Sequence, residues 1–118
     1  MRKCKIYIPM GARSNNGPLL PIIKRIRKDC YIELVCEVYD ANFTLICGDR
    51  EEMFKWTEEA FYHNIPIIHL GSGILNSFAT KDDIYRHMIT LMSDIQLCES
   101  KQALYNTCQL LNSIGKRF

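Results

Sequence analysis

Two glycine-containing segments carry side chains suited to holding a charged or hydroxylated ligand. One begins with Gly11 and includes Arg13, whose planar guanidinium can hold a phosphate or a carboxylate through two hydrogen bonds. The other places Asp49 and Arg50 directly after an apolar run, where a carboxylate can act as a base or contact a sugar hydroxyl. Each segment also has a structural interpretation, as a glycine turn and as a helix N-cap respectively.

Two further segments bring histidines next to polar or glycine residues. His69 ends an apolar run and can exchange a proton with a ligand or be a hydrogen-bonded core residue. Three candidate ligand-binding residues follow it: Gly71, Ser72 and Gly73. Asp83, Arg86 and His87 share a helix face, as an acid–base set or as a plain helical ion pair. The histidines and cysteines lack the spacing of a metal site, and we expect neither a metal nor a cofactor.

Strands and helices alternate along the chain. Apolar, β-rich runs predict strands at residues 5–10, 31–38, 43–47, 65–70 and 95–98. Helical spacing predicts helices at residues 18–28, 51–63, 80–93 and 101–114. This order predicts a three-layer α/β domain, Rossmann-like or flavodoxin-like, with a mainly parallel sheet of about five strands and helices on both faces. Ligands bind at the carboxyl ends of such strands, so the four segments and Ser100 are expected to surround one hollow.

The connection between the second and third predicted strands is short. Only residues 39–42 separate them, whereas a parallel crossover normally needs about a dozen residues. The second strand can end early, the two strands can form an antiparallel hairpin, or the edge can be exchanged with another copy. We expect the early end, although Asp-Ala-Asn at residues 40–42 is also turn-like.

Length and composition exclude several classes of protein. The 118 residues predict a single domain spanning residues 1–118. A formal net charge of +2 is too small to predict binding to nucleic acid or to an anionic membrane, and no apolar run reaches the length of a membrane span. Six cysteines without a C-x-x-C pair, and no apparent signal peptide, predict free thiols in the cytoplasm. Four of them lie in apolar, strand-like runs: Cys4, Cys36, Cys47 and Cys98.

The segments occur in the order found in the UDP-N-acetylglucosamine 2-epimerases, and the chain resembles the N-terminal domain of that family, especially its hydrolysing branch. The match consists of Met-Gly-Ala-Arg and the following Gly-Pro-Leu-Leu-Pro-Ile-Ile-Lys (residues 10–13 and 17–24), Gly-Asp-Arg-Glu-Glu-Met (48–53), Asn-Ile-Pro-Ile-Ile-His (64–69) and Asp-Asp-Ile-Tyr-Arg-His-Met-Ile-Thr-Leu-Met-Ser (82–93). The resemblance implies that Asp49 corresponds to a catalytic carboxylate and Arg13 to an arginine near the diphosphate. Three residues correspond to the last motif: Asp83, Arg86 and His87.

The sequence also departs from the family pattern. The family has two domains with the active site between them, and the resemblance covers only the first. The family carries a glutamate thought to be catalytic in the turn after the histidine, where this chain has Ile74. An isoleucine cannot exchange a proton, so acid–base chemistry at that position is lost.

Three functions follow from these observations. The favoured one is a single-domain protein that binds a nucleotide-sugar or phosphorylated nucleotide without full epimerase activity. The second is a minimal epimerase or hydrolase completed by dimerisation, with Asp49 as base and His69 or His87 as acid. The third is a pseudo-enzyme that acts through protein contacts. A homodimer is expected from the resemblance alone.

Overall fold

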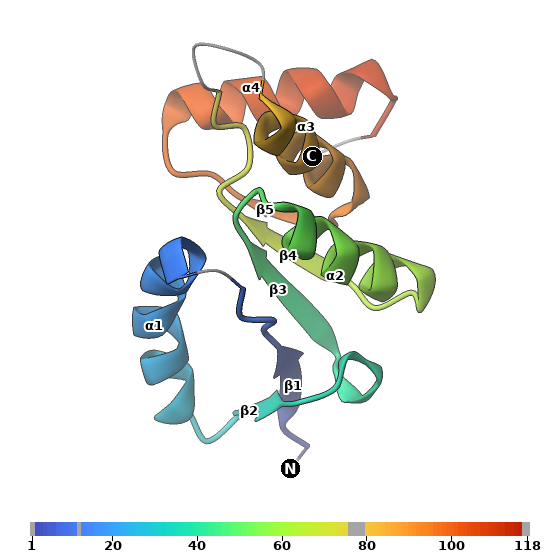
Figure 1. The fold of residues 1–118 in the computed structure, drawn as a ribbon. Helices are drawn as coiled ribbons and strands as arrows, with labels where there is room; N and C mark the ends of the chain where they lie inside the picture. The colour runs from blue at the N-terminus through green and yellow to red at the C-terminus, as the bar shows by residue number, and fades with distance from the viewer. Residues whose placement is uncertain (1, 12, 76–79, 117–118) are drawn as a thin grey trace.

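The chain folds into one five-stranded sheet with helices on both sides (Figure 1). A computed structural model describes residues 2–11, 13–75 and 80–116, apart from the side chains of residues 13–16. The elements in chain order are β1 (Cys4–Tyr7), α1 (Arg13–Arg27), β2 (Ile32–Val35), the short 3-10 helix η1 (Val38–Asp40), β3 (Phe43–Cys47), α2 (Glu51–Tyr62), β4 (Ile67–Leu70), α3 (Lys81–Met92), β5 (Ile95–Leu97) and α4 (Lys101–Ser113).

All five strands run parallel in the order β2-β1-β3-β4-β5, which confirms the predicted α/β class. Successive residues of β3 point to opposite faces of the sheet. Leu45 packs with Leu19 of α1 on one face, whereas Ile46 packs with Met53 of α2 and Ile89 of α3 on the other. The predicted helices on both faces are therefore confirmed, and the core consists of two apolar clusters separated by the sheet.

The short connection after β2 is possible because β3 starts, along β1, near the level at which β2 ends, and the two strands share only two positions of β1. Tyr7 of β1 is level with Val35 at the end of β2 and with Thr44 at the start of β3. The chain therefore needs only to move sideways past β1 through η1, and need not return along a whole strand. The early strand end is confirmed, and the antiparallel hairpin is wrong because both strands run parallel to β1.

Helix α1 differs most from its prediction. It begins at Arg13, so Pro18 and Pro21 lie inside it, and most of the expected glycine turn is helical. Burial of Leu19 and Ile26 against the sheet shows how tertiary packing can outweigh a poor local helix propensity. One smaller expectation was also wrong: Cys36 was predicted to lie within a strand, but β2 ends at Val35 and Cys36 is exposed.

Candidate functional site

The loops after β3, β4 and β5 meet at the carboxyl edge of the sheet, where the sequence predicted a site. Gly48 and Gly73 have φ values of 109° and 79°, which side chains other than glycine rarely adopt. A Cβ atom on Gly73 would lie 2.0 Å from the Ala103 carbonyl oxygen. Glycine at this position therefore lets the turn after β4 pack directly against α4.

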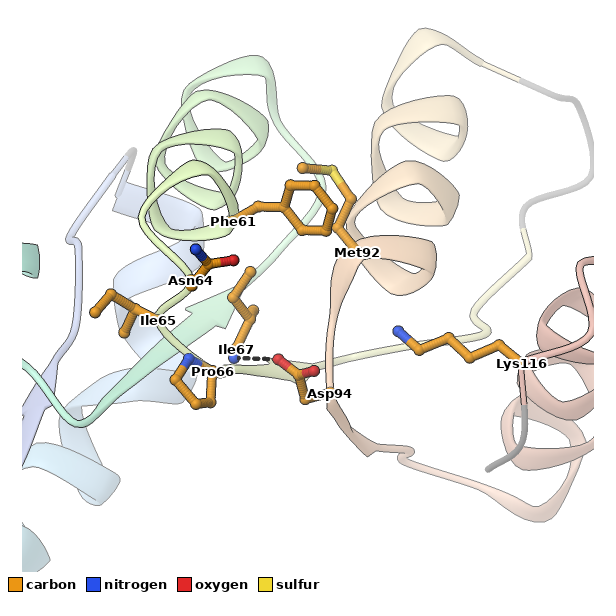
Figure 2. A pocket seen from close by; sticks show the side chains of 8 residues that line it. All are labelled: Phe61, Asn64, Ile65, Pro66, Ile67, Met92, Asp94 and Lys116. Carbon is orange, nitrogen blue, oxygen red and sulfur yellow. Dashed lines mark hydrogen bonds between the residues drawn. The ribbon is translucent and has the colours of Figure 1, made fainter.

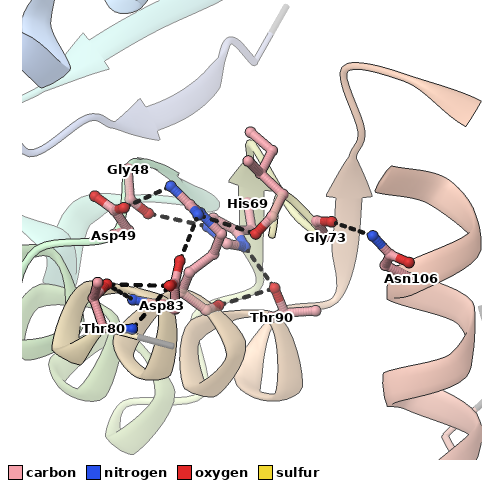
Figure 3. A network of polar contacts seen from close by, with 10 residues as sticks. Gly48, Asp49, His69, Gly73, Thr80, Asp83, Thr90 and Asn106 are labelled. Carbon is pink, nitrogen blue, oxygen red and sulfur yellow. Dashed lines mark hydrogen bonds and ion pairs between the residues drawn. The ribbon is translucent and has the colours of Figure 1, made fainter. Parts of the chain in front are cut away.

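An arginine bound by two carboxylates joins these loops to α3 (Figure 3). Arg86 Nη2 lies 2.5 Å from Asp49 Oδ2, and Arg86 Nη1 lies 3.3 Å from Asp83 Oδ1. Arg86 Nη1 also donates to the Ile74 carbonyl oxygen at 3.0 Å. The Arg86 side chain is 11% exposed and that of Asp49 is 20% exposed. Two carboxylates neutralise this guanidinium, so its clearest role is to hold the loop after β3 and the turn after β4 against α3.

The helix N-termini at this edge differ in how their backbone N–H groups are satisfied. Thr80 caps α3 in a capping box with Asp83, and Ser100 caps α4 by accepting from the Ala103 N–H at 3.0 Å. Arg50 occupies the N-cap position of α2 and provides no side-chain cap. Arg50 is exposed, and within the described residues no hydrogen bond or ion pair holds its side chain. The start of α2 therefore lacks a cap from its N-cap side chain and lies beside a cation that has no partner among the described residues.

His69 lies behind the Asp49–Arg86 pair and is fully buried. Its Nε2 is 3.3 Å from the Gly48 carbonyl oxygen. Its Nδ1 is 3.0 Å from Ser72 Oγ and 3.1 Å from Thr90 Oγ1. Burial lowers the pKa of His69 to about 4, so the ring is neutral at physiological pH. The interpretation of His69 as a hydrogen-bonded core residue fits this position better than contact with a ligand.

The other predicted residues are more dispersed. Ser72 is fully buried and donates to Gln96 Oε1, so it too lies behind the site surface. His87 is half-buried, and burial lowers its pKa while the Asp83 carboxylate raises it. Gly11 lies against the first turn of α2, where an added Cβ would be 2.5 Å from the Met53 side chain. The side chain of Arg13 lies outside the described residues.

Two pockets illustrate the difference between the two edges of the sheet. One of about 440 Å³ lies at the carboxyl edge, between the Gly73–Leu75 turn and the start of α4, and includes the predicted Ser100. Another of about 210 Å³ lies near the start of β4 (Figure 2). There Asp94 accepts from the Ile67 N–H, and Lys116 donates to carbonyl oxygens at the end of α3. Polar groups at the second pocket thus serve the backbone.

Sequence reasoning missed two residues of the buried network. Thr90 donates to the Arg86 carbonyl oxygen at 3.0 Å, and Gln96 Nε2 donates to the Thr90 carbonyl oxygen at 2.8 Å. The signal for Gln96 was its position as the single amide within the apolar run at residues 95–98. A buried amide needs hydrogen-bond partners, and that requirement could have directed attention to β5.

Two classes of site find no support in the described part of the chain. No three histidine, cysteine, aspartate or glutamate side chains are grouped there to hold a metal ion. None of the helices described combines the length and apolar character needed to cross a membrane.

Comparison with known proteins supports the ancestry suggested by the motifs. The sequence model of the UDP-N-acetylglucosamine 2-epimerase family matches residues 30–113. Polysialic acid biosynthesis protein P7 of Escherichia coli is 36% identical over 80 residues, which are 68% of this chain and 20% of that protein.

Solved structures share the fold at low sequence identity. A UDP-N-acetylglucosamine 2-epimerase crystal structure superposes with a TM-score of 0.83 at 15% identity, covering 92% of this chain and 45% of that one. A Neisseria meningitidis UDP-GlcNAc 2-epimerase bound to UDP-GlcNAc gives 0.81 at 14% identity, covering 89% and 42%. The chain thus spans less than half of these structures and a fifth of the curated relative. With its family match over residues 30–113, the chain belongs to the UDP-N-acetylglucosamine 2-epimerase family.

Proposed function

We propose that this chain binds a nucleotide-sugar or a related phosphorylated nucleotide at the carboxyl edge of its sheet, without full epimerase activity of its own. The observation that carries the proposal is the start of α2, where Arg50 is exposed, has no partner among the described side chains and does not cap the helix. The positive end of a helix dipole and a guanidinium together attract a phosphate. A family member of the same fold is bound to UDP-GlcNAc.

The acidic residues next to Arg50 indicate where the phosphate and the sugar of the ligand would each lie. Glu51 is paired with Lys55 at 3.4 Å, which reduces the negative charge in the first turn of α2. Asp49 adjoins Arg50, keeps part of its carboxylate exposed and can accept hydrogen bonds from sugar hydroxyls. We therefore place the phosphate at Arg50 and the sugar at Asp49.

Loss of the family glutamate supports binding rather than turnover. Ile74 occupies that position, and its carbonyl oxygen accepts from Arg86. Asp49 is already paired with that arginine, and His69 is buried behind it. Among the residues predicted to be catalytic, Asp49 is the carboxylate that stays partly exposed and Asp83 is buried, whereas epimerisation needs an acid and a base on the ligand.

The test is calorimetric titration with UDP, UDP-N-acetylglucosamine and uridine. We expect the two phosphorylated ligands to bind and uridine, which lacks phosphate, to bind at least tenfold more weakly. A ligand at ten times its Kd should also stabilise the fold by about 1.4 kcal/mol. Arg50→Ala should weaken UDP binding about tenfold, whereas Arg25→Ala, at an exposed position of α1, should change it less than twofold.

Two outcomes would contradict the proposal. If neither phosphorylated ligand binds at millimolar concentration, the pseudo-enzyme that acts through protein contacts becomes the better account. If the purified protein turns over UDP-N-acetylglucosamine and Asp49→Asn abolishes that turnover, the minimal enzyme is correct.

A further inference from the structure

Both members of the Asp49–Arg86 pair are anchored to the same buried ring. The Gly48 carbonyl oxygen, in the peptide bond that leads into Asp49, lies 3.3 Å from His69 Nε2. On the other side, Thr90 Oγ1 lies 3.1 Å from His69 Nδ1 and 3.0 Å from the Arg86 carbonyl oxygen. The backbone of each ion-pair member is thus linked to His69 directly or through one hydroxyl.

The chemistry of the partners fixes the protonation of the ring. A carbonyl oxygen only accepts, so Nε2 carries the proton and donates it to Gly48, which leaves Nδ1 as an acceptor. The hydroxyls of Ser72 and Thr90 are the donors within reach of Nδ1. Each also faces a second acceptor, Gln96 Oε1 or the Arg86 carbonyl oxygen. Ser72 Oγ also lies 3.4 Å from the His69 carbonyl oxygen. Two hydroxyl protons therefore serve four acceptors, which couples β4, α3 and β5 around the ring.

We propose that His69 is the positioning residue of the ligand site, which sets Asp49 and Arg86 in register without touching the ligand. This role rests on the proposed function, because the pair belongs to the proposed sugar-binding part of the site. Full burial separates the ring from any ligand at the surface. Its hydrogen bonds reach the loop after β3 and, through Thr90, the helix that carries Arg86.

Two substitutions separate the branches of this network. His69→Gln can retain a donor near the position of Nε2 and so preserve the bond to Gly48, while it loses the Nδ1 acceptor. His69→Leu removes both. The matched control is Thr57→Val, because Thr57 is equally buried and donates to the Met53 carbonyl oxygen at 2.8 Å within α2.

The experiment combines NMR of the Arg86 guanidinium with calorimetric titration of UDP-N-acetylglucosamine. In His69→Leu we expect the guanidinium signals to move toward those of a free arginine and Kd to rise at least tenfold. His69→Gln should give intermediate values and carries the test if His69→Leu does not fold. Thr57→Val should lower the melting temperature. Its Kd should stay within twofold of the wild-type value, and its Arg86 guanidinium signals should not shift.

The two proposals can fail separately. If His69→Leu and His69→Gln leave the guanidinium signals unchanged while stability falls as in Thr57→Val, His69 is only structural and the positioning role is wrong. If the wild-type protein binds no nucleotide, the binding function is wrong, and the NMR comparison still decides whether His69 positions the ion pair.

Discussion

The starts of α2, α3 and α4 face the same edge of the sheet, yet only two of them are closed. At the start of α3, the side chains of Thr80 and Asp83 each accept from the backbone N–H of the other residue. At the start of α4, the Ser100 side chain accepts from the Ala103 N–H. At α2 the corresponding position is Arg50, a donor that cannot cap an N–H group. Two of these helix starts are thus capped within the fold, and the third is the one at which we propose that the ligand binds.

The largest loss of stability should come from removing the arginine that ties α3 to the loops at this edge. Arg86→Ala would leave Asp49 and Asp83 near each other without their shared cation. We expect a loss of about 3 kcal/mol in the free energy of unfolding, measured by urea denaturation. Arg25→Ala, at an exposed position of α1, should cost less than about 0.5 kcal/mol. Equal losses of stability in the two variants would show that the ion pairs of Arg86 stabilise the fold no more than an exposed side chain does.

Acid should weaken the buried network behind the closed ends. The pKa of His69 is about 4 in the fold and 6.5 without burial, so the unfolded chain binds more protons between these values. Stability should therefore fall as pH drops from 6.5 to 4, by on the order of 3 kcal/mol, with His87 adding in the same direction. Urea titrations at pH 7 and pH 4.5 check this, and His69→Gln should show a smaller change. An equal change in that variant would assign the acid sensitivity to other groups.

The glycine that lets the β4 turn reach α4 can be tested against a second glycine of similar backbone conformation. Gly73 and Gly115 have φ values of 79° and 74°, but only at Gly73 would a Cβ collide with another segment. Gly73→Ala should cost about 2–3 kcal/mol and Gly115→Ala about 1 kcal/mol. If thermal melts show equal losses of stability for the two variants, the close packing of Gly73 against α4 adds nothing to the cost of its positive φ.

The smallest effects concern the caps themselves. Thr80→Ala should cost about 1 kcal/mol, because α3 loses a capping box. Arg50→Asp should do the opposite at α2, adding a cap and up to about 1 kcal/mol of stability while it weakens UDP binding. Differential scanning calorimetry measures both. A loss of stability in Arg50→Asp would mean that Arg50 already supports the helix.

The sequence predicted those parts of the fold that depend on local patterns. The continuous apolar run at β3 and the Thr80–Asp83 spacing each led to the correct element. The start of α1 was missed because packing of Leu19 and Ile26 outweighs the local effect of two prolines. The positions at which β2 and β3 pair with β1 also depend on residues that are distant in the sequence. The sequence alone therefore left several paths open for the short connection between β2 and β3.

Sequence patterns predicted which candidate residues lie at the carboxyl edge of the sheet better than they predicted the contacts of those residues. Strand ends indicated Asp49 and the turn after β4, and helical spacing gave the Asp83–Arg86 pair. Pairing of Arg86 with Asp49 joins residues 37 positions apart, and burial of His69 depends on what packs around it. Whether a polar side chain is free or already paired is a tertiary property. The sequence named Arg50 and Asp49 together, and only the structure distinguishes the exposed Arg50 side chain from the ion-paired Asp49.

The most direct test of the account is a ¹⁵N–¹H NMR titration of the protein with UDP. We predict that the amide signals of Glu51 and Met53 shift progressively, because a phosphate at the start of α2 would accept hydrogen bonds from their N–H groups. The amides at the capped starts of α3 and α4, residues 81–83 and 101–103, should stay in place. Shifts at the capped starts with none at α2, or no shifts at all, would contradict the assignment of the ligand to the open helix.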